Sequence, residues 1–388
     1  MNRLWIVSAV VHAYVALRLV PGIAQFAGPA AALALGALLL ASAALVPMSL
    51  RRHRGRRSDA EQRRDDRLAW VSLGLMGLFS SLFVLTLLRD AALVLAGLVH
   101  LVGGPLPASR WMDGSAAAVP LLALAVSVVG LWNARRPARV KSVDVPVRDL
   151  PPALEGFRIA QISDLHVGPT IKRAYLQRIV ESVNALEVDV VAVTGDLVDG
   201  SVADLGPHVA PLANLRSRHG SFVVTGNHEY YSGAEPWIAE LRRLGLTVLM
   251  NEHVVLTHPG ASGRERAPLV LAGVADWSAH HFEPSHRSDP HRAVAGAPRA
   301  AIKVLLAHQP RSAPAAADAG FHLQLSGHTH GGQFLPWNFF VRFQQPFTAG
   351  LHALRDLWVY TSRGTGYWGP PKRFGAPSEI THLRLVAA

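Results

Sequence analysis

Two histidines separated by one residue, His328 and His330, lie in the glycine-rich stretch SGHTHGGQ, residues 326–333. The largely apolar residues before it predict a short, half-buried strand. Glycines on both sides of the pair allow a sharp turn and a close approach of the backbone to a bound group. Two imidazoles on such a turn can bind a metal ion, but the pair alone is equally compatible with two surface histidines.

Four further predicted strands also end in residues that can bind a divalent cation. Asp164 and His166 follow residues 157–163, Asp196 and Asp199 follow 188–194, Asn227, His228 and Glu229 follow 221–225, and His308 follows 302–307. Taken singly, such residues are typical of turns, helix caps and buried histidines. Because ligand sites in α/β sheets lie at strand ends, their recurrence after five strands predicts one shared site.

The residue types in this set indicate which metals would bind. The set contains carboxylates, imidazoles and one amide, and the chain has no cysteine. These ligands suit Mn, Fe or Zn, and the missing cysteines exclude zinc–thiolate sites, disulfides and cysteine nucleophiles. Because there are more ligands than one ion can use, we expect two divalent metal ions about 3.5–4 Å apart that share a carboxylate, an arrangement suited to in-line displacement at phosphorus.

The order of these motifs resembles a known family. D-x-H, G-D, G-N-H-E, a lone H and G-H-x-H occur in the order typical of the calcineurin-like metallophosphoesterases, over nearly all of residues 157–386. SGHTHGGQ, LLAHQP and SRGTGYWGPP are similar to the bacterial branch with membrane-associated, phosphodiesterase-type members. The resemblance implies two packed mixed β-sheets flanked by helices. It also implies an active enzyme, because every core motif position is filled.

The same resemblance assigns roles to eight residues. The first metal ion would be bound by Asp164, His166 and His330, and the second by Asn227, His308 and His328. Asp196 would bridge the two ions, so that one tight turn carrying two histidines serves both. His228 would not bind metal but would contact the phosphoryl oxygens or protonate the leaving alkoxide. A metal-bound hydroxide would then attack phosphorus and hydrolyse a phosphodiester or pyrophosphate bond.

From about residue 142 the chain alternates between short β-rich runs and helical patterns. Strands are predicted at 157–163, 188–194, 221–225, 268–274, 302–307, 322–326, 357–361 and 379–386, and amphipathic helices at 172–186 and 234–244. Mixed strands and helices over this length predict one layered α/β (α+β) domain with sheet at its centre.

The N-terminal third is much more apolar. Four nearly uncharged stretches, at about 4–20, 28–50, 68–88 and 115–133, approach the roughly 20 residues that a membrane-spanning helix needs. Residues 89–104, which begin with Arg89 and Asp90, are expected to form an interfacial or re-entrant segment rather than a fifth span. We therefore expect an all-α transmembrane region over 1–134, a linker over 135–152 and a catalytic domain over 153–388.

The basic residues predict how the chain is oriented. Residues 51–67 contain eight arginines and ARRPARVK follows the fourth span, whereas residues 21–27 carry no charge. Arginine-rich loops stay cytoplasmic, so both termini and the catalytic domain are expected on the cytoplasmic side of the inner membrane, in a multi-pass protein. The net charge of +11 is attributed to arginines near anionic headgroups, and nucleic acid is not an expected partner. No clear cleavage site follows the first stretch, so a cleaved signal peptide is not expected.

The substrate is less well specified. Membrane anchoring favours a lipid-linked or nucleotide-lipid phosphoester, and related family members that cleave a UDP-diacylglucosamine pyrophosphate bond make that bond a candidate by resemblance. Arg363 is compatible with a phosphate-holding loop or with a plain turn. Six aromatic residues near the motifs are compatible with pocket lining or with packing: Tyr230, Tyr231, Trp277, Trp337, Tyr367 and Trp368. The residues that bind substrate and the oligomeric state are not specified.

Two alternatives remain at this stage. One is a membrane transporter or sensor whose metal-binding domain is regulatory, and the other is a metal-containing scaffold without turnover. Intramembrane charges usually mark transport pathways, and the predicted spans carry few ionisable residues, chiefly His12 and Arg18. The complete motif set favours the enzyme.

Overall fold

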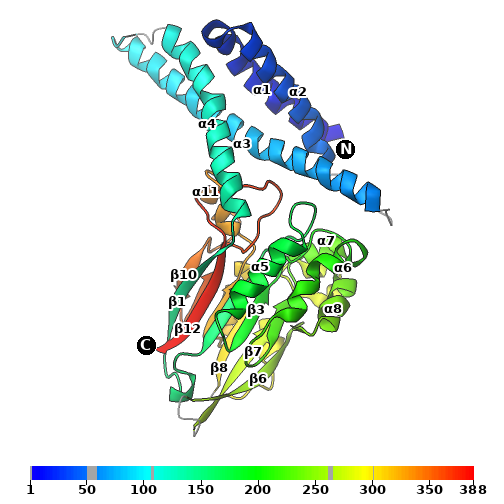
Figure 1. The fold of residues 1–388 in the computed structure, drawn as a ribbon. Helices are drawn as coiled ribbons and strands as arrows, with labels where there is room; N and C mark the ends of the chain where they lie inside the picture. Colours follow the sequence, from blue (N-terminus) through cyan, green and yellow to red (C-terminus); the bar gives the residue numbers. More distant parts are fainter. Residues whose placement is uncertain (1, 50–58, 106–108, 261–264, 300) are drawn as a thin grey trace. The chain divides into compact units, whose positions relative to one another are not determined.

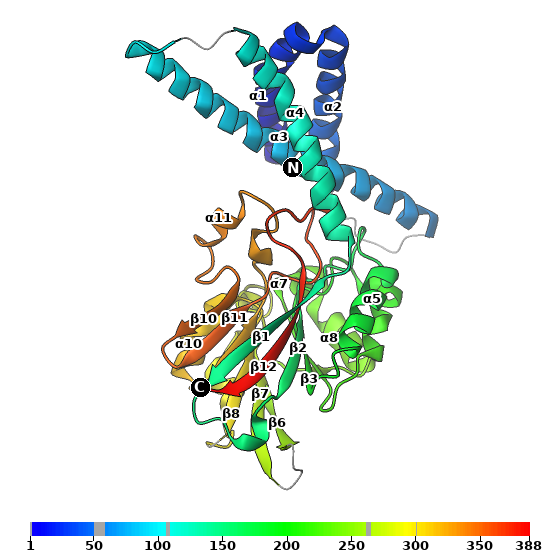
Figure 2. The same cartoon turned by 60° about the vertical axis from the view of Figure 1, so that its left-hand side comes forward.

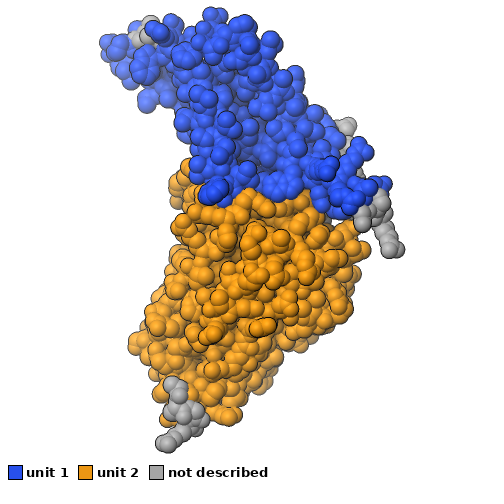
Figure 3. All heavy atoms as spheres, in the orientation of Figure 1, with its two compact units in different colours: residues 1–132, 369–372 blue, residues 133–368, 373–388 orange. Residues whose placement is uncertain are grey.

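The computed structural model describes residues 2–49, 59–105, 109–260, 265–299 and 301–388. These form two compact units, one of residues 1–132 with 369–372 and one of residues 133–368 with 373–388 (Figure 3). Five of the eight arginines of residues 51–67 lie in residues 50–58, outside the described residues.

The first unit consists of long apolar helices. They are α1 (Asn2–Ala27), α2 (Pro29–Ser49), α3 (Asp59–Leu101) and α4 (Ser109–Arg135). Gly28, with a φ of 88°, is the single residue between α1 and α2. All four helices are long and apolar enough to cross a membrane, and they bury a shared core that includes Leu19, Leu39, Leu82 and Val119. The expected N-terminal region of about four apolar helices is confirmed.

The structure differs from the sequence prediction at residues 89–104. Helix α3 continues without a break to Leu101, so Arg89 and Asp90 do not begin a separate segment. Both charges have partners within the unit, because Asp90 Oδ2 accepts hydrogen bonds from Arg18 Nε and Tyr14 Oη at 2.7 Å, and Arg89 Nε donates to Ser115 Oγ at 2.9 Å. These pairings explain how an apolar helix accommodates the two charged residues.

The second unit contains two six-stranded sheets (Figures 1 and 2). The first sheet has the order β1 (Arg139–Val147), β12 (Glu379–Ala387), β2 (Arg158–Ile162), β3 (Val190–Thr194), β4 (Ser221–Val224) and β5 (Thr247–Val248). The second has the order β10 (Gly350–Leu354), β11 (Leu357–Thr361), β9 (Leu323–Ser326), β8 (Ile302–Leu306), β7 (Arg266–Gly273) and β6 (Glu252–Pro259). Strands β2 to β5 are parallel, as are β7, β8, β9 and β11.

The central strands of each sheet are buried on both faces, which explains their nearly continuous apolar runs. In β3, Val190 faces the core between the two sheets, whereas Val191 faces the core under the helices. Helices α5 (Arg173–Asn184), α6 (Val202–Val209) and α8 (Ala234–Arg243) cover the first sheet, and α9 (Pro290–Val294) and α10 (Ala313–Asp318) cover the second. The predicted fold of two mixed sheets flanked by helices is confirmed.

Shorter helices complete the unit. They are α7 (Asn227–Ser232), α11 (Asn338–Val341) and six 3₁₀ helices, at Pro152–Leu154, Ala210–Asn214, Ala279–His281, Pro284–His286, Pro310–Ser312 and His330–Gly332. The last of these carries part of the SGHTHGGQ motif.

The eight predicted strands correspond to β2, β3, β4, β7, β8, β9, β11 and β12, and the two predicted helices to α5 and α8. The segment 135–152, expected to be a linker, instead contains β1, which pairs with β12 over nine residues. Val145 and Val147 of β1 are buried. The basic residues and prolines around them obscured this alternation, and Pro146 is tolerated because β1 is an edge strand.

Candidate metal centre

The predicted ligands lie at the carboxyl ends of the parallel strands. Asp164 and His166 follow β2, Asp196 follows β3, Asn227 begins α7 after β4, His308 follows β8, and His328 and His330 follow β9. The side chains of Asp164, Asp196 and His308 are almost completely buried. The two sheets pack face to face, and the strand ends on this side bring together residues up to 166 positions apart in the sequence.

Two groups of side chains point their ligand atoms at one another. Asp164, His166 and His330 form one group, and Asp196, His308 and His328 form the other, with the ligand atoms of each group within 4.8 Å of one another. In the first group the Nε2 atoms of His166 and His330 are 3.0 Å apart. In the second group Nε2 of His308 is 3.2 Å from Nδ1 of His328. Such facing ring nitrogens suit a shared cation.

Asp196 lies between the two groups. Its Oδ2 atom is 3.1 Å from Nε2 of His308 and 3.9 Å from Nε2 of His166. A third group, of His166, Asp196 and His228, also has its ligand atoms within 4.8 Å of one another. It shares His166 with the first group and Asp196 with the second. Asp196 therefore lies within 4 Å of an imidazole nitrogen of each group, and its bridging role stays a prediction.

Two buried oxygens show that the residues fit cations. In the described part of the chain, Asp164 Oδ2 and Asn227 Oδ1 are buried and have no hydrogen-bond partner. Leaving a buried polar atom unpaired costs about 1–3 kcal/mol, which a bound ion or water can offset. Eight other buried side-chain atoms of the described residues also lack a partner, so the two oxygens count because they lie among the predicted ligands. Both atoms are oxygen donors that divalent cations accept, and each belongs to a residue predicted to bind a different ion.

The backbone at these positions is strained. Asp164, His166, Asp196, His328 and His330 have φ values between 50° and 68°, in the left-handed region that favours glycine. Each such residue costs on the order of 1–3 kcal/mol, and strain of this kind concentrates at functional sites. The tight turns bring Asp164 and His166 of one motif, and His328 and His330 of another, into the ligand groups at the same strand ends.

Glycines allow the turns to pack against one another. A Cβ atom at Gly226 would collide with the carboxylate of Asp196, and one at Gly327 would collide with Ser163 and Asp164. The glycines of G-N-H-E and G-H-x-H are thus required because each turn lies against a predicted ligand of another turn.

The histidines of the site differ in charge. Burial alone would lower the pKa of His228, but the carboxylates of Asp196 and Asp199 outweigh it and raise this pKa to about 9. Burial lowers the pKa of His328 to about 3 and that of His330 well below its ordinary value. At neutral pH His228 therefore carries a proton, whereas His328 and His330 are neutral, the form in which imidazoles bind metal. His308 differs from these two, because burial lowers its pKa but the carboxylate of Asp196 outweighs burial and raises this pKa well above its ordinary value.

Residues 157–332 match the family model described as calcineurin-like phosphoesterase. A Bos taurus protein named transmembrane protein with metallophosphoesterase domain is 41% identical over 313 residues, which are 79% of this chain and 70% of that protein. The chain belongs to the calcineurin-like metallophosphoesterases. A Danio rerio protein of the same name is 39% identical over 69% of this chain and 62% of its own length. An uncharacterized metallophosphoesterase of Helicobacter pylori is 40% identical over 59% of this chain and 60% of its own length.

Two carboxylates of this metallophosphoesterase support the predicted site residues without belonging to the predicted set. Asp199 Oδ1 is 3.2 Å from Nδ1 of His166 and 2.5 Å from Nδ1 of His228, so it orients both rings. Glu229 accepts hydrogen bonds from the backbone N–H groups of Gly226, Asp196 and Leu197 at 2.6–2.9 Å. Burial raises the pKa of Glu229 to about 7. Both residues lie inside the motifs, so their positions were visible in the sequence.

Arg373 also supports the site of this metallophosphoesterase, and no motif pointed to it. Its guanidinium is fully buried and donates from Nη1 to the carbonyl oxygens of His330 and Arg363, both at 2.8 Å. Its Nη2 atom lies 3.1 Å from Nδ1 of His330. Arg373 therefore holds the turn of His330 in place from a position 43 residues further along the chain.

The aromatic residues near the motifs divide into two kinds. The rings of Tyr231 and Trp368 lie edge-on to His228, with centroids at 5.1 and 5.7 Å, and Phe282 contacts Tyr231. These three side chains are exposed and form a rim beside His228. Tyr230 and Tyr367 are instead buried in the domain.

The two remaining aromatic candidates and Arg363 lie elsewhere. Trp277 lies under the guanidinium of Arg311, and Trp337 adjoins α11. Arg363 has its Nη1 atom 3.7 Å from Oε2 of Glu379.

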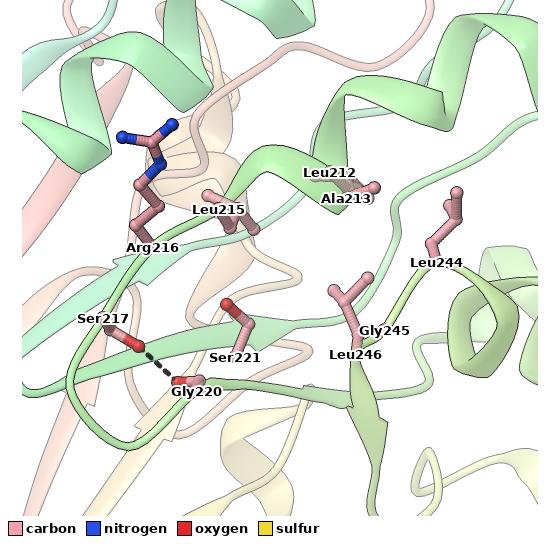
Figure 4. Close-up of a pocket in the computed structure, with 10 residues that line it drawn as sticks. All are labelled: Leu212, Ala213, Leu215, Arg216, Ser217, Gly220, Ser221, Leu244, Gly245 and Leu246. Atoms are coloured by element: carbon pink, nitrogen blue, oxygen red, sulfur yellow. Dashed lines mark hydrogen bonds between the residues drawn. The ribbon is translucent and has the colours of Figure 1, made fainter.

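A separate pocket of about 300 Å³ lies at the start of β4, at the opposite end of this strand from Asn227 (Figure 4). It is lined by Leu212, Ala213, Leu215, Arg216, Ser217, Gly220, Ser221, Leu244, Gly245 and Leu246. None of the predicted site residues lines it, so it is not part of the candidate centre.

Proposed function

We propose that this protein is a membrane-anchored, two-metal phosphoesterase that hydrolyses a phosphodiester or pyrophosphate bond. The observation that carries the proposal is the place of Asp196, whose Oδ2 atom lies 3.1 Å from Nε2 of His308 in one ligand group and 3.9 Å from Nε2 of His166 in the other. The buried oxygens of Asp164 and Asn227 without a hydrogen-bond partner add to it. One ion would be held by Asp164, His166 and His330, the other by Asn227, His308 and His328, with Asp196 between them. Mn, Fe and Zn suit this ligand set.

Two divalent cations at this site would supply a nucleophile from water at neutral pH and offset negative charge on the phosphoryl group. The protein's own contribution centres on His228. Asp199 accepts a hydrogen bond from Nδ1 of this ring, which leaves Nε2 facing the site, 4.0 Å from Asp196 Oδ2. His228 is protonated at neutral pH, so its Nε2–H is placed to neutralise a phosphoryl oxygen and then to protonate the leaving alkoxide.

The first test compares Asp196→Asn with Asp189→Asn. Both aspartates are buried, but Asp189 precedes β3 and Asp196 follows it. The full-length proteins, purified in detergent with Mn²⁺, are assayed on an aryl phosphodiester, and bound metal per chain is measured by elemental analysis. We expect Asp196→Asn to lose activity by on the order of 10³-fold and to lose metal, because it removes charge stabilisation at the centre. Asp189→Asn should retain both.

The outcomes separate the function from the substrate. Wild-type turnover that survives in Asp196→Asn would contradict the assigned centre. Two bound metal ions per chain without turnover would indicate a pocket that rejects the aryl substrate, and would favour the scaffold alternative if lipid and nucleotide esters also failed. Absence of bound metal would contradict the proposal as a whole.

We further propose a lipid-linked phosphoester as the substrate. The exposed rim of Tyr231, Trp368 and Phe282 beside His228 offers apolar surface next to the phosphoryl position. A substrate with acyl chains or a base could use this surface, whereas a small inorganic phosphoester could not. Comparison of kcat/KM for a phospholipid-like diester and for its water-soluble headgroup analogue tests this, with a higher value expected for the lipid.

The apolar helices are proposed to anchor the domain to the inner membrane from the cytoplasmic side. The polar side chains of the bundle support an anchor over a transport pathway, since Arg18 pairs with Asp90, and His12 lies between Ser8 and Ser42. The chain has no cysteine, so Ser201→Cys places a single exposed thiol on the catalytic domain. Labelling of this thiol from outside intact cells would contradict the cytoplasmic assignment.

A further inference from the structure

The second unit, residues 133–368 with 373–388, is called the catalytic unit below. It exposes a short stretch of large apolar side chains next to the candidate centre. This aromatic segment, residues 335–343, has the sequence LPWNFFVRF and includes α11. Phe339, Phe340 and Phe343 are 58%, 54% and 74% exposed. Removing such apolar surface from water is favourable, and clustered exposure of this kind marks a contact surface.

The aromatic segment is held in place at both ends. At its start, Leu335 N donates to the carbonyl oxygen of Phe374 at 3.0 Å. Just past its end, Arg311 Nε donates to the carbonyl oxygen of Gln344 at 2.7 Å, and Gln345 Nε2 donates to Gln309 Oε1 at 3.1 Å. The phenylalanines are therefore presented outward by an anchored backbone.

The segment is also packed against the turn that carries His330. A Cβ atom at Gly332 would collide with the backbone of Asn338, so the 3₁₀ turn and α11 are in direct contact. Figure 2 shows α11 beyond the strand ends of the second sheet, the edge at which the predicted ligands lie. The exposed phenylalanines and the candidate centre consequently share one rigid turn.

Hydrogen bonds connect this segment to the place where the chain leaves the last candidate span. That span ends at Arg135, and its final turn, from Asn133, belongs to the catalytic unit. Asn133 Nδ2 donates to the carbonyl oxygen of Arg373 at 3.2 Å, and the next residue, Phe374, accepts the hydrogen bond of Leu335 N. Because a few residues of chain reach only about 3.5 Å each, an α4 that crosses a bilayer would keep this part of the domain close to the membrane surface.

We propose that the aromatic segment is inserted into the interfacial layer of the same bilayer that the apolar helices cross. Phe339, Phe340 and Phe343 would contact acyl chains, and Arg342 would meet anionic headgroups. The composition fits this partner, since residues 333–350 contain no acidic residue, and the exposed Arg342 lies 5.2 Å from the ring centroid of Phe343. Aromatic residues next to a basic residue are typical of segments that lie at the membrane surface.

The insertion would set the height of the candidate centre above the membrane. Because the segment is packed on the turn of His330, seating it in the interface would hold the predicted ligands near the level of lipid phosphates. This consequence rests on the proposed function, whereas the insertion itself does not depend on catalysis.

The test uses the absence of cysteine in the chain. Phe340→Cys and Phe343→Cys carry a spin label in full-length protein reconstituted into vesicles of phosphatidylethanolamine and phosphatidylglycerol. Asp356→Cys is the control, since Asp356 is 88% exposed in the turn between β10 and β11, at the amino end of β11. Label depth is measured from collisions with oxygen, which enters the bilayer, and with a nickel chelate, which stays in water.

The labels at 340 and 343 should lie about 5–10 Å into the interface, with oxygen favoured over nickel, and the label at 356 should show the reverse. Equal nickel accessibility at all three positions would overturn the proposal. Labels at 340 and 343 shielded from both reagents would indicate cover by protein, and spin–spin broadening would identify that cover as a second copy of the chain; either result would also overturn it. None of these readouts requires turnover, so failure of the proposed catalysis would leave the result interpretable.

Discussion

The catalytic unit contains two clusters of histidine and aspartate, at opposite ends of its parallel strands. At the carboxyl ends lie His166, His308, His328 and His330 with their aspartates. At the amino ends, His219 and His258 lie beside Asp189, with Nε2 of His219 3.1 Å from Nδ1 of His258. Both clusters have paired imidazoles and a buried carboxylate, so residue type alone does not separate them.

The two clusters differ in the hydrogen-bond partners of their carboxylates and in their backbone angles. Asp189 Oδ2 accepts a hydrogen bond from the backbone N–H of Arg158 at 2.8 Å, and Oδ1 lies 3.7 Å from Arg218 Nε. Phe157 packs against both imidazoles of this cluster. The residues of the amino-end cluster have ordinary backbone angles, whereas five residues of the carboxyl-end cluster are in the left-handed region.

The comparison shows what marks a candidate metal centre in this fold. Unpaired buried oxygens and strained turns are unfavourable in themselves, and they persist where a bound group compensates for them. A satisfied cluster such as that of Asp189 needs no such group. Substitutions at the carboxyl end should therefore change chemistry, and substitutions at the amino end should change stability alone.

The largest effect in this comparison is expected for His228→Ala. Removing a positioned proton donor should lower kcat by on the order of 10²–10⁴-fold on an aryl phosphodiester. Bound metal per chain should remain at the wild-type level, because His228 is not among the proposed ligands. His219→Ala at the amino end serves as the matched control and should retain activity. Metal loss in His228→Ala would reassign this histidine to the ligands.

A smaller effect is expected for Asp199→Asn, which should lower activity about 10–100-fold, as is typical for groups that orient metal-binding residues. A pH profile distinguishes this role from general damage. Asp199 raises the pKa of His228, and His228 acts in its protonated form, so activity should be lost as pH rises through that pKa. In Asp199→Asn the alkaline limb should move to lower pH. An unchanged limb with reduced activity would indicate a merely structural role.

Much of the fold and of the centre could be predicted from the sequence because it rests on local patterns. The apolar strands β2, β3, β4, β8 and β9 are each followed by a motif residue, and strand ends meet at one edge in parallel sheets. The fold, the family and about four apolar helices are confirmed. The ligand assignments and the domain boundaries stay predictions.

Other features depended on tertiary contacts that no local pattern reports. Strand β1 is formed by pairing with β12, more than 230 residues away, so its weak alternation resembled a linker. The charges of Arg89 and Asp90 resembled a helix break because their partners lie on α1 and α4. Arg373 donates hydrogen bonds to the turn of His330 from a buried position, which its local sequence GPPKR does not indicate.

The smallest effect is expected at the amino-end cluster, from His258→Gln. Burial lowers the pKa of His219 and of His258, with Asp189 opposing this change and Arg218 adding to it. The folded state then binds fewer protons than the unfolded state once pH falls below about 6.5, so the two histidines make the domain less stable as pH drops through this value. Glutamine does not titrate, so His258→Gln removes the part of this acid destabilisation that comes from His258.

The melting temperature of the full-length protein in detergent, followed by tryptophan fluorescence, should thus fall less between pH 7.5 and 5.5 in His258→Gln than in wild type. A difference of about 1 kcal/mol corresponds to about 2–4 °C for a domain of this size. Groups elsewhere titrate equally in both proteins and cancel in this comparison. Activity and bound metal at pH 7.5 should match wild type, since the substitution lies at the far end of the strands from Asp196. Loss of metal or activity would show that the two clusters are coupled through the sheets, and the distinction between a satisfied cluster and a metal centre would no longer hold.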